Sequence, residues 1–130
     1  MFPPIFIYAS ASNAVKALIG SSPVRFWPFG SAPQPGQPAY GRPYAVWQLV
    51  YGSPENYLGN LPNADSYGCQ VDAYADTATL ARAVAQALRD SLEPHGHVVS
   101  YNGEDLDKAT GLYRASFTVD LWNERATSTP

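Results

Sequence analysis

Two histidines one residue apart, His95 and His97, are the first side chains in this sequence that could bind a metal ion. On a strand, residues i and i+2 point to the same face, so both imidazole rings would face one way. Two imidazoles do not complete a metal site, because a closed zinc site takes four ligands and no third ligand is visible. The sequence therefore favours histidines at a helix end and a strand start, and predicts no metal and no cofactor.

Carboxylates gather in two places where they could act on a cation or as an acid–base pair. Glu104, Asp105 and Asp107 lack the alternating Asp spacing and distal Glu of a calcium loop, so a solvated turn is the better interpretation. Asp72 and Asp120 fall on the polar faces of two predicted strands, and they could form a general acid–base pair if those strands are neighbours. No pocket signature accompanies them, so no catalytic residue is predicted and the chain is not expected to be an enzyme.

The single cysteine, Cys69, excludes an intrachain disulfide and a cysteine metal site. It lies in a run that predicts a strand, and no histidine-containing motif accompanies it as the base of a thiol catalyst. A small buried hydrophobic side chain is therefore expected at this position. The segment GSAPQPG, 30–36, is no phosphate-binding loop, because it lacks the lysine and the following helix.

The charge and composition of the chain limit its partners. The 130 residues carry a net charge of −3 with no basic run, whereas a protein that grips nucleic acid needs clustered Lys and Arg, so no specific DNA binding is predicted. Charged residues make up only 15% and aromatic residues 13%, which suits a subunit whose neighbours cover part of its surface. The length suits one domain, 1–123, followed by a flexible polar tail, 124–130.

Neither a signal peptide nor a membrane span is predicted. The N-terminal segment lacks a basic n-region, and no apolar run approaches the ~18 residues that a membrane helix needs. A soluble and reducing compartment is therefore expected.

The elements that position these side chains follow from hydrophobic periodicity. One helix is expected over 4–19, and a second begins after Asp76 as its N-cap and ends at Pro94 and Gly96. The apolar stripe of the second helix recurs every four residues and should pack on a sheet. The sequence predicts an α+β fold in the order α-β-β-β-α-β-β, with a mostly antiparallel sheet of about five strands and both helices on one face. Strands are predicted over 23–29, 44–51, 65–75, 97–101 and 111–122, with a turn at Asn102-Gly103.

Two long loops carry side chains that the domain's own core does not need. The first, 28–43, holds five prolines and three glycines, and it could be a stiff surface connector, an arm laid on a neighbouring subunit, or a ligand for a proline-recognition domain. The second, 52–64, carries three large apolar side chains, and loops of that length are usually functional or disordered. The residues predicted to contact other chains are Pro54, Glu55, Asn56, Tyr57, Leu58, Leu61, Phe29 and Tyr40.

Three segments together resemble the tail completion, or tail terminator, proteins of long-tailed phages and prophages. They are VWQLVYGSPENYL (46–58), QVDAYADTATLARAVAQALRDSLE (70–93) and DKATGLYRASFTVDLW (107–122). The start of the chain and the segment RFWPFGSAPQ are similar in register, so the resemblance covers nearly the whole chain. The longer, Pro-rich segment 31–43 departs from the family.

The resemblance implies a structural virion protein of a siphophage that assembles in the host cytoplasm. Such proteins form a ring, generally of six copies, which caps the head-proximal end of the tail tube, stops tube polymerisation and docks to the head connector while DNA passes through. The expected partners are therefore further copies of the chain, the tail tube protein and the head–tail connector protein, with no membrane. The alternatives are another head–tail neck protein, or a small α+β ligand-binding domain or enzyme. The last would require Asp72, Asp120 and His97 to cluster in a cleft.

Overall fold

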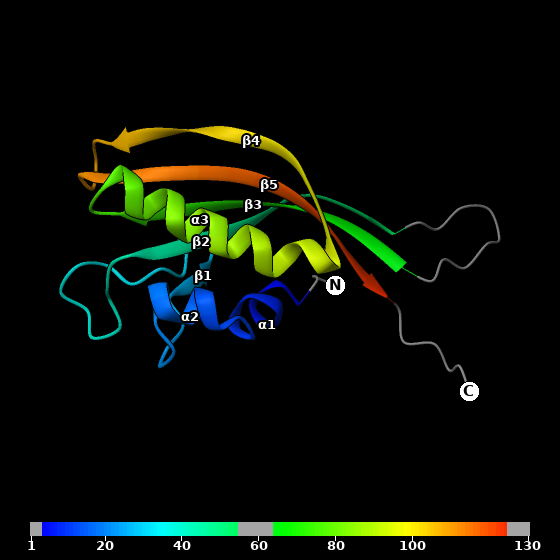
Figure 1. Cartoon of the computed structure of the whole chain (residues 1–130), viewed down its shortest axis with the longest axis horizontal. Helices are drawn as coiled ribbons and strands as arrows, with labels where there is room; N and C mark the ends of the chain where they lie inside the picture. Colours follow the sequence, from blue (N-terminus) through cyan, green and yellow to red (C-terminus); the bar gives the residue numbers. More distant parts are fainter. Residues whose placement is uncertain (1–3, 55–63, 125–130) are drawn as a thin grey trace.

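The computed structural model describes residues 4–54 and 64–124, and these form an α+β fold with helices on one face of a five-stranded sheet (Figure 1). The strand order is β1-β2-β3-β5-β4. All neighbouring strands are antiparallel except β1, which runs parallel to β2, so the predicted fold class is confirmed and the sheet is mixed. The elements are α1 (Ile5–Ser10), α2 (Asn13–Ile19), β1 (Phe26–Pro28), β2 (Tyr44–Pro54), β3 (Ala64–Ala75), α3 (Ala78–Leu92), the 3-10 turn η1 (Glu93–His95), β4 (Gly96–Asp107) and β5 (Leu112–Glu124).

The single helix predicted over 4–19 is wrong, because two short helices occupy this stretch. Ser12 is extended, with ψ 125°, and its hydroxyl accepts a hydrogen bond from the Val15 backbone N–H at 3.2 Å. A serine that bonds a backbone N–H three residues on favours an N-cap over a helix interior. The side chain of Ser12 therefore caps the start of α2, and each of the two helices buries two side chains in the core.

The long helix α3 begins one residue later than predicted. Thr77 is its N-cap, and the Thr77 hydroxyl accepts from the Leu80 N–H at 3.1 Å. The Asp76 carboxylate, predicted to be the cap, instead pairs with the Arg42 guanidinium at 3.1 Å. The predicted apolar stripe is confirmed at its centre, although Ala83 is exposed and Ala81 is buried in its place.

The edge strand β4 is the largest departure from the predicted elements. The sequence predicts a short strand and a turn at Asn102-Gly103, but β4 continues to Asp107 and the chain turns over residues 108–111. The register with β5 shifts twice, once after Val98 and once after Tyr101, so two bulges interrupt the strand. Asn102 is the extra residue of the second bulge and Gly103 has φ 110°, so this dipeptide bends a strand instead of closing a hairpin.

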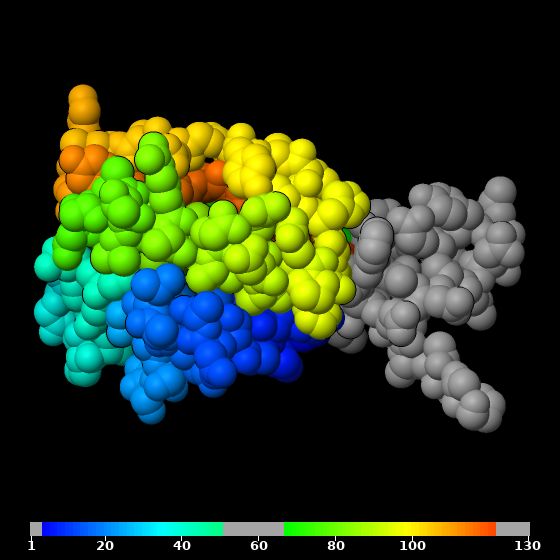
Figure 2. Space-filling model, viewed as in Figure 1, coloured from blue at the N-terminus to red at the C-terminus, as the bar shows by residue number. Residues whose placement is uncertain are grey.

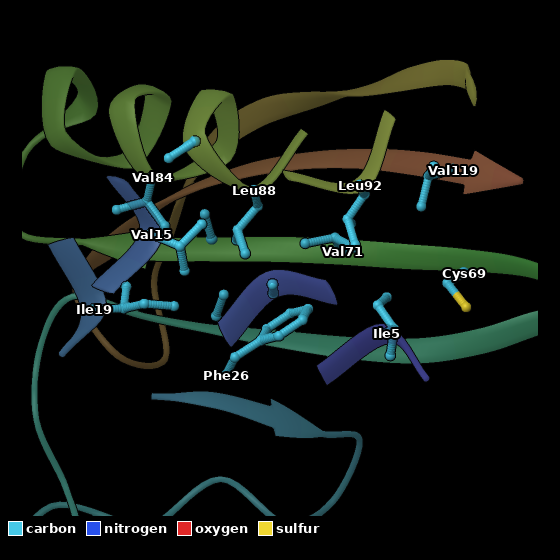
Figure 3. Close-up of a cluster of buried hydrophobic side chains, with 14 of the residues drawn as sticks. Ile5, Val15, Ile19, Phe26, Cys69, Val71, Val84, Leu88, Leu92 and Val119 are labelled. Atoms are coloured by element: carbon cyan, nitrogen blue, oxygen red, sulfur yellow. The ribbon is translucent and has the colours of Figure 1, made fainter. Parts of the chain in front are cut away.

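The hydrophobic core lies between the sheet and all three helices (Figure 3). Side chains from α1, α2 and α3 meet side chains from β3 and β5 in one buried cluster, which confirms the prediction that the helices share one face. Cys69 on β3 is fully buried within this cluster, as predicted. Within residues 4–54 and 64–124, no helix is long and apolar enough to cross a bilayer.

Burial of Cys69 predicts a loss of stability at alkaline pH. Burial, with a smaller effect of the Asp120 charge, raises the pKa of the Cys69 thiol from 9.0 to about 12. The unfolded thiol loses its proton first, so this contribution to stability is complete below about pH 9 and is lost between about pH 9 and 12. In urea unfolding at several alkaline pH values, Cys69→Ala should flatten the decline of the unfolding free energy. An unchanged slope in the variant would contradict this prediction.

Candidate assembly interface

The Pro-rich arm, residues 29–43, is a chain of tight turns. The Ser31 N–H donates to the Pro28 carbonyl at 2.9 Å, with Gly30 at φ 84°. In a second turn, the Gln37 N–H donates to the Gln34 carbonyl at 3.0 Å, with Gly36 at φ 95°. Both glycines occupy the third position of a turn, where a positive φ favours Gly. The prolines and glycines therefore give the arm a defined shape.

Phe29 stands out from the first of these turns. Its side chain is 73% exposed, more than that of any other large hydrophobic residue in the described part of the chain. Its backbone is fixed, because the Phe29 N–H donates to the Trp47 carbonyl at 2.8 Å and the turn closes directly after it. An aromatic ring on a fixed backbone loses little conformational entropy when another molecule covers it. Phe29 therefore has the exposure and rigidity of an interface anchor.

The return leg of the arm is tied to the body of the domain at two points. The Arg25 Nε donates to the Pro43 carbonyl at 2.8 Å, and the Arg42 guanidinium pairs with the Asp76 carboxylate at the start of α3. Gly41 lies against the Arg25 side chain so closely that an added Cβ would stand 2.8 Å from its Cδ. The arm is therefore held beside β1, with Arg25 as its main anchor.

Three tyrosines continue this attachment onto the helix-free face of the sheet. Tyr40 packs at a tilt on Tyr44, with ring centroids 6.1 Å apart, and Tyr44 stacks on Tyr74 at 5.1 Å. Burial, together with the neighbouring Tyr74, Tyr40 and Asp107, raises the pKa of Tyr44 to about 12. Because its ring packs on Tyr44, Tyr40 contributes to packing within the chain as well as to any contact with a partner.

A groove separates α3 from the edge strand β4 (Figure 2). Its volume is about 490 Å³, and Ala115 and Phe117 of β5 form its floor. Ala85 lines the α3 wall, while Tyr101, which is 67% exposed, stands on the β4 side. A second hollow of about 230 Å³ continues the groove toward Leu106, another exposed apolar side chain of β4. The groove therefore offers a long apolar floor with accessible walls.

The charged side chains in the walls of the groove already form ion pairs. Arg82 of α3 and Glu104 of β4 form two hydrogen bonds, of 2.7 and 2.8 Å, and the Arg82 hydrogen bonds lower the pKa of the Glu104 carboxyl. Arg89 pairs with Glu93 at 3.2 Å, while its Nε is buried with no hydrogen-bond partner among the described residues. The groove is thus nearly neutral, with one unused donor in its wall.

Sequence reasoning misses this groove because it ends the edge strand too early. With a turn at Asn102-Gly103, Tyr101 would end the predicted strand 97–101 and Glu104 would lie beyond the turn, so the strand would not form a continuous wall facing α3. The available signal is the length of the partner strand, since a twelve-residue strand predicted over 111–122 needs a comparably long neighbour to satisfy its backbone. The segment DKATG then supplies the turn, with the Asp107 carboxylate accepting from the Ala109 N–H at 3.1 Å.

The helix-free face of the sheet is covered by short polar side chains that bond to one another. Asn102 of β4 donates to Thr118 at 2.8 Å and to Ser116 at 3.4 Å, and both of these β5 side chains are nearly buried. On the neighbouring strand β3, the Gln70 side chain donates to the Asp72 carboxylate of the same strand at 3.2 Å. These polar side chains of the helix-free face are therefore paired with one another.

Arg114 on the helix-free face is already paired with carboxylates. Arg114 makes a two-pronged contact with Asp105, at 3.1 and 3.3 Å, and lies 3.9 Å from Asp72. These two carboxylates neutralise the guanidinium, and the Asp105 hydrogen bonds raise the pKa of Arg114. The charge of Arg114 is therefore largely compensated and contributes little to the attraction of a phosphate.

The residues predicted for a catalytic or metal site are spread out. Asp72 of β3 lies opposite Ser116 of β5. Asp120 of β5 lies opposite Gly68, which precedes Asp72 by four residues in β3. At ~3.3 Å per residue this offset is roughly 13 Å, so the two carboxylates do not form a pair.

The two histidines do not share a strand. His97 is adjacent to Asp120 in the register of β4 and β5, whereas His95 belongs to η1 and stacks on Tyr8 with ring centroids 3.6 Å apart. The prediction of one histidine at a helix end and one at a strand start is therefore confirmed, and the two rings do not face one way from a single strand. No group of three potential metal ligands occurs among residues 4–54 and 64–124.

The predicted contact residues fall into three groups. Phe29 and Tyr40 belong to the arm, where Phe29 is exposed and Tyr40 is half-buried. Pro54 ends β2, with its backbone opposite Asp65. The remaining five, Glu55, Asn56, Tyr57, Leu58 and Leu61, lie outside the described residues.

Comparisons with known proteins give the chain a family. A family model described as "Tail completion protein gp17" matches residues 4–124. A solved structure entitled "Virion of native gene transfer agent (GTA) particle" contains a chain similar to this one, with a TM-score of 0.58 and 16% sequence identity over 93% of this chain and 92% of that one. At that identity the likeness shows a shared fold. No curated protein matches the chain. Because the family model spans nearly all of the described residues, the chain belongs to the tail completion protein gp17 family and is a structural protein of a phage tail.

Proposed function

We propose that this chain forms a ring, of six copies, that caps the head-proximal end of the tail tube. The ring stops tube polymerisation and provides the surface that docks to the head connector. Membership of the tail completion family over residues 4–124 is the observation that carries the proposal. The neighbour of similar fold comes from a virion structure, which is compatible with the same kind of role.

The domain has two unlike edges, as a ring subunit needs. A closed ring is built from heterologous contacts, in which one surface of each copy meets a different surface of the next. The first edge of the sheet is β1 with the arm, and the opposite edge is β4 with its groove. Both edges carry exposed aromatic side chains, Phe29 on the arm and Tyr101 on β4, of the type that is enriched at interfaces.

The helix-free face suits the lumen through which DNA passes. It carries Asp72, Asp105 and Asp120, while Arg114 is neutralised by two carboxylates. A wall of this charge does not compete for phosphates, so DNA slides through without specific binding. Helices on the opposite face would then form the outside of the ring.

The predicted loop 52–64 is shorter in the structure, because β2 continues to Pro54 and β3 begins at Ala64. Its remaining residues, 55–63, lie outside the described residues and are expected to contact the tail tube or the connector. In the double variant Tyr57→Ala, Leu58→Ala, the isolated chain should keep the unfolding midpoint of the unchanged protein while losing ring or tube contacts. The measurement combines thermal unfolding with electron microscopy of tubes assembled with and without the protein. Unfolding of the isolated variant would mean that this loop packs on its own core and has no partner contact.

The capping role itself is tested with purified tail tube protein. Added full-length chain should bind one end of the tubes and hold their length constant when further tube subunits are supplied. Tubes that continue to grow would contradict the proposal. Binding to the head connector alone, with no binding to tubes, would instead identify a neck protein on the head side.

A further inference from the structure

We propose that neighbouring copies meet β1 edge to β4 edge, with the Phe29 turn of one copy seated in the α3–β4 groove of the next. The inference rests on the proposed ring and specifies its subunit contact. The β1 edge is defined as α2, β1 and the arm, and the β4 edge as β4 with the groove. The two edges lie on opposite sides of the domain (Figure 1). When two copies meet in this way, one copy keeps a free β1 edge and the other a free β4 edge, and further copies can be added at each.

The β1 edge carries positive side chains and the strand β4 carries negative ones. Residues 4–54, which form α1, α2, β1, the arm and β2, contain Lys16, Arg25 and Arg42 and no carboxylate. β4 contains Glu104, Asp105 and Asp107 and no Lys or Arg. Opposite charges on the two edges favour a head-to-tail contact, and they disfavour a twofold contact that brings like edges together.

Part of this charge is uncompensated within one copy. Lys16 and Arg25 form no ion pair with the described residues, and Asp107 forms none either. Asp107 accepts only from the Ala109 N–H and the Thr110 hydroxyl of its own turn. Free charges of opposite sign on the two edges are therefore available to an adjacent copy.

The centre of the proposed contact matches in polarity. Residues 29–41 of the arm carry no charged side chain, and the groove arginines, Arg82 and Arg89, are paired with glutamates. The apolar floor at Ala115 and Phe117 suits the ring of Phe29. The uncharged arm would thus lie in a nearly neutral groove, with the charges of the β1 and β4 edges around it. Protein interfaces have the same arrangement of an apolar core and a polar rim.

The arm also carries backbone hydrogen-bond acceptors, which an arginine donor in the groove wall lacks. Four prolines in the arm, 29–43, have no N–H, so the arm carries more hydrogen-bond acceptors than donors in its backbone. The Arg89 Nε is a buried donor without a partner among the described residues, in the groove wall. A carbonyl of the inserted arm would satisfy this donor, which otherwise stays desolvated at a free-energy cost.

Cross-linking between two single-cysteine additions tests the pairing. Ser31→Cys places a thiol beside Phe29 in the turn, and Gln86→Cys places one on the α3 wall of the groove; both side chains are exposed. The two variants are purified separately, mixed at a concentration where sedimentation velocity shows the oligomer, and treated with a short bis-maleimide. The expected result is a mixed product that joins one copy of each variant, with little product from either variant alone. The unchanged chain should give no product, because Cys69 is fully buried.

The outcomes separate this inference from the proposed ring. An oligomer that gives no mixed product, or that links like with like, overturns the β1-to-β4 pairing while leaving a ring possible. A chain that stays monomeric at every concentration and gives no cross-link counts against the ring and the pairing together.

Matched charge reversals give a second test. Lys16→Glu, on the β1 edge, should weaken association about tenfold or more at low salt, with the difference shrinking as salt is raised. Lys108→Glu makes the same change in net charge but lies in the turn beside β4, so association should be unchanged or stronger. Equal weakening by both reversals would overturn the inference.

Discussion

Phe117→Ala should lower the free energy of unfolding by about 3–5 kcal/mol, the range for truncation of a buried aromatic side chain. Phe117 is 1% exposed at the centre of the sheet, opposite Val71 of β3 and Tyr101 of β4. The loss is a large part of the 5–15 kcal/mol that holds a typical domain together. Thermal unfolding followed by circular dichroism should show a fall in midpoint of at least about 10 °C.

A second Phe→Ala change provides the matched control for this stability prediction. Phe29→Ala removes the same atoms from a side chain that is 73% exposed, so the unfolding free energy should change by no more than about 0.5 kcal/mol. Equal destabilisation by the two variants would show that Phe29 packs within its own domain. A midpoint unchanged by Phe117→Ala would contradict the burial of the β5 side chain.

The large effect expected for Phe29→Ala is on assembly. Truncation of an aromatic anchor at an interface costs about 2 kcal/mol or more, which is roughly 30-fold in the affinity of one contact. A closed ring repeats that contact between every pair of neighbours, so the losses combine and the ring should be absent at concentrations where the unchanged chain forms it. Sedimentation velocity and electron microscopy of the two chains at equal concentration measure this directly.

A substitution elsewhere on the arm controls for general disturbance of the surface. Gln34→Ala lies at an exposed turn of the same arm and alters no aromatic contact, so it should leave assembly unchanged. A ring that survives Phe29→Ala would remove Phe29 from the contact. Loss of the ring in both variants would point instead to the shape of the arm as a whole.

The sequence predicts those elements well whose side chains alternate between core and water. β3, β5 and α3 follow directly from their periodicity, because burial on a single face dictates the spacing of apolar residues. β4 does not, since its side chains are mostly exposed and Asn102-Gly103 carries a strong local turn signal. Pairing with β5 over its whole length overrides that local signal, and no short window of sequence contains this long-range information.

The sequence likewise predicts one part of the candidate interface and misses the other. The exposure of Phe29 follows from its place in a Pro- and Gly-rich loop, which the sequence identifies. The groove does not follow, because it depends on the distance between α3 and a strand that the sequence ends too early. The parallel pairing of β1 with β2 is likewise set by the path of the long connection between them, which composition alone does not define.

The two bulges of β4 have a consequence for the free chain before it joins a virion. An unpaired edge strand is a template for aggregation when it is long, flat and hydrophobic. Here the register breaks after Val98 and after Tyr101, and three carboxylates occupy the last four positions of the strand. Bent backbone and like charges oppose direct strand-to-strand pairing between two copies, so β4 is protected from amyloid-like stacking. The same edge can thus resist pairing with another copy of itself and still accept a different surface as a specific partner.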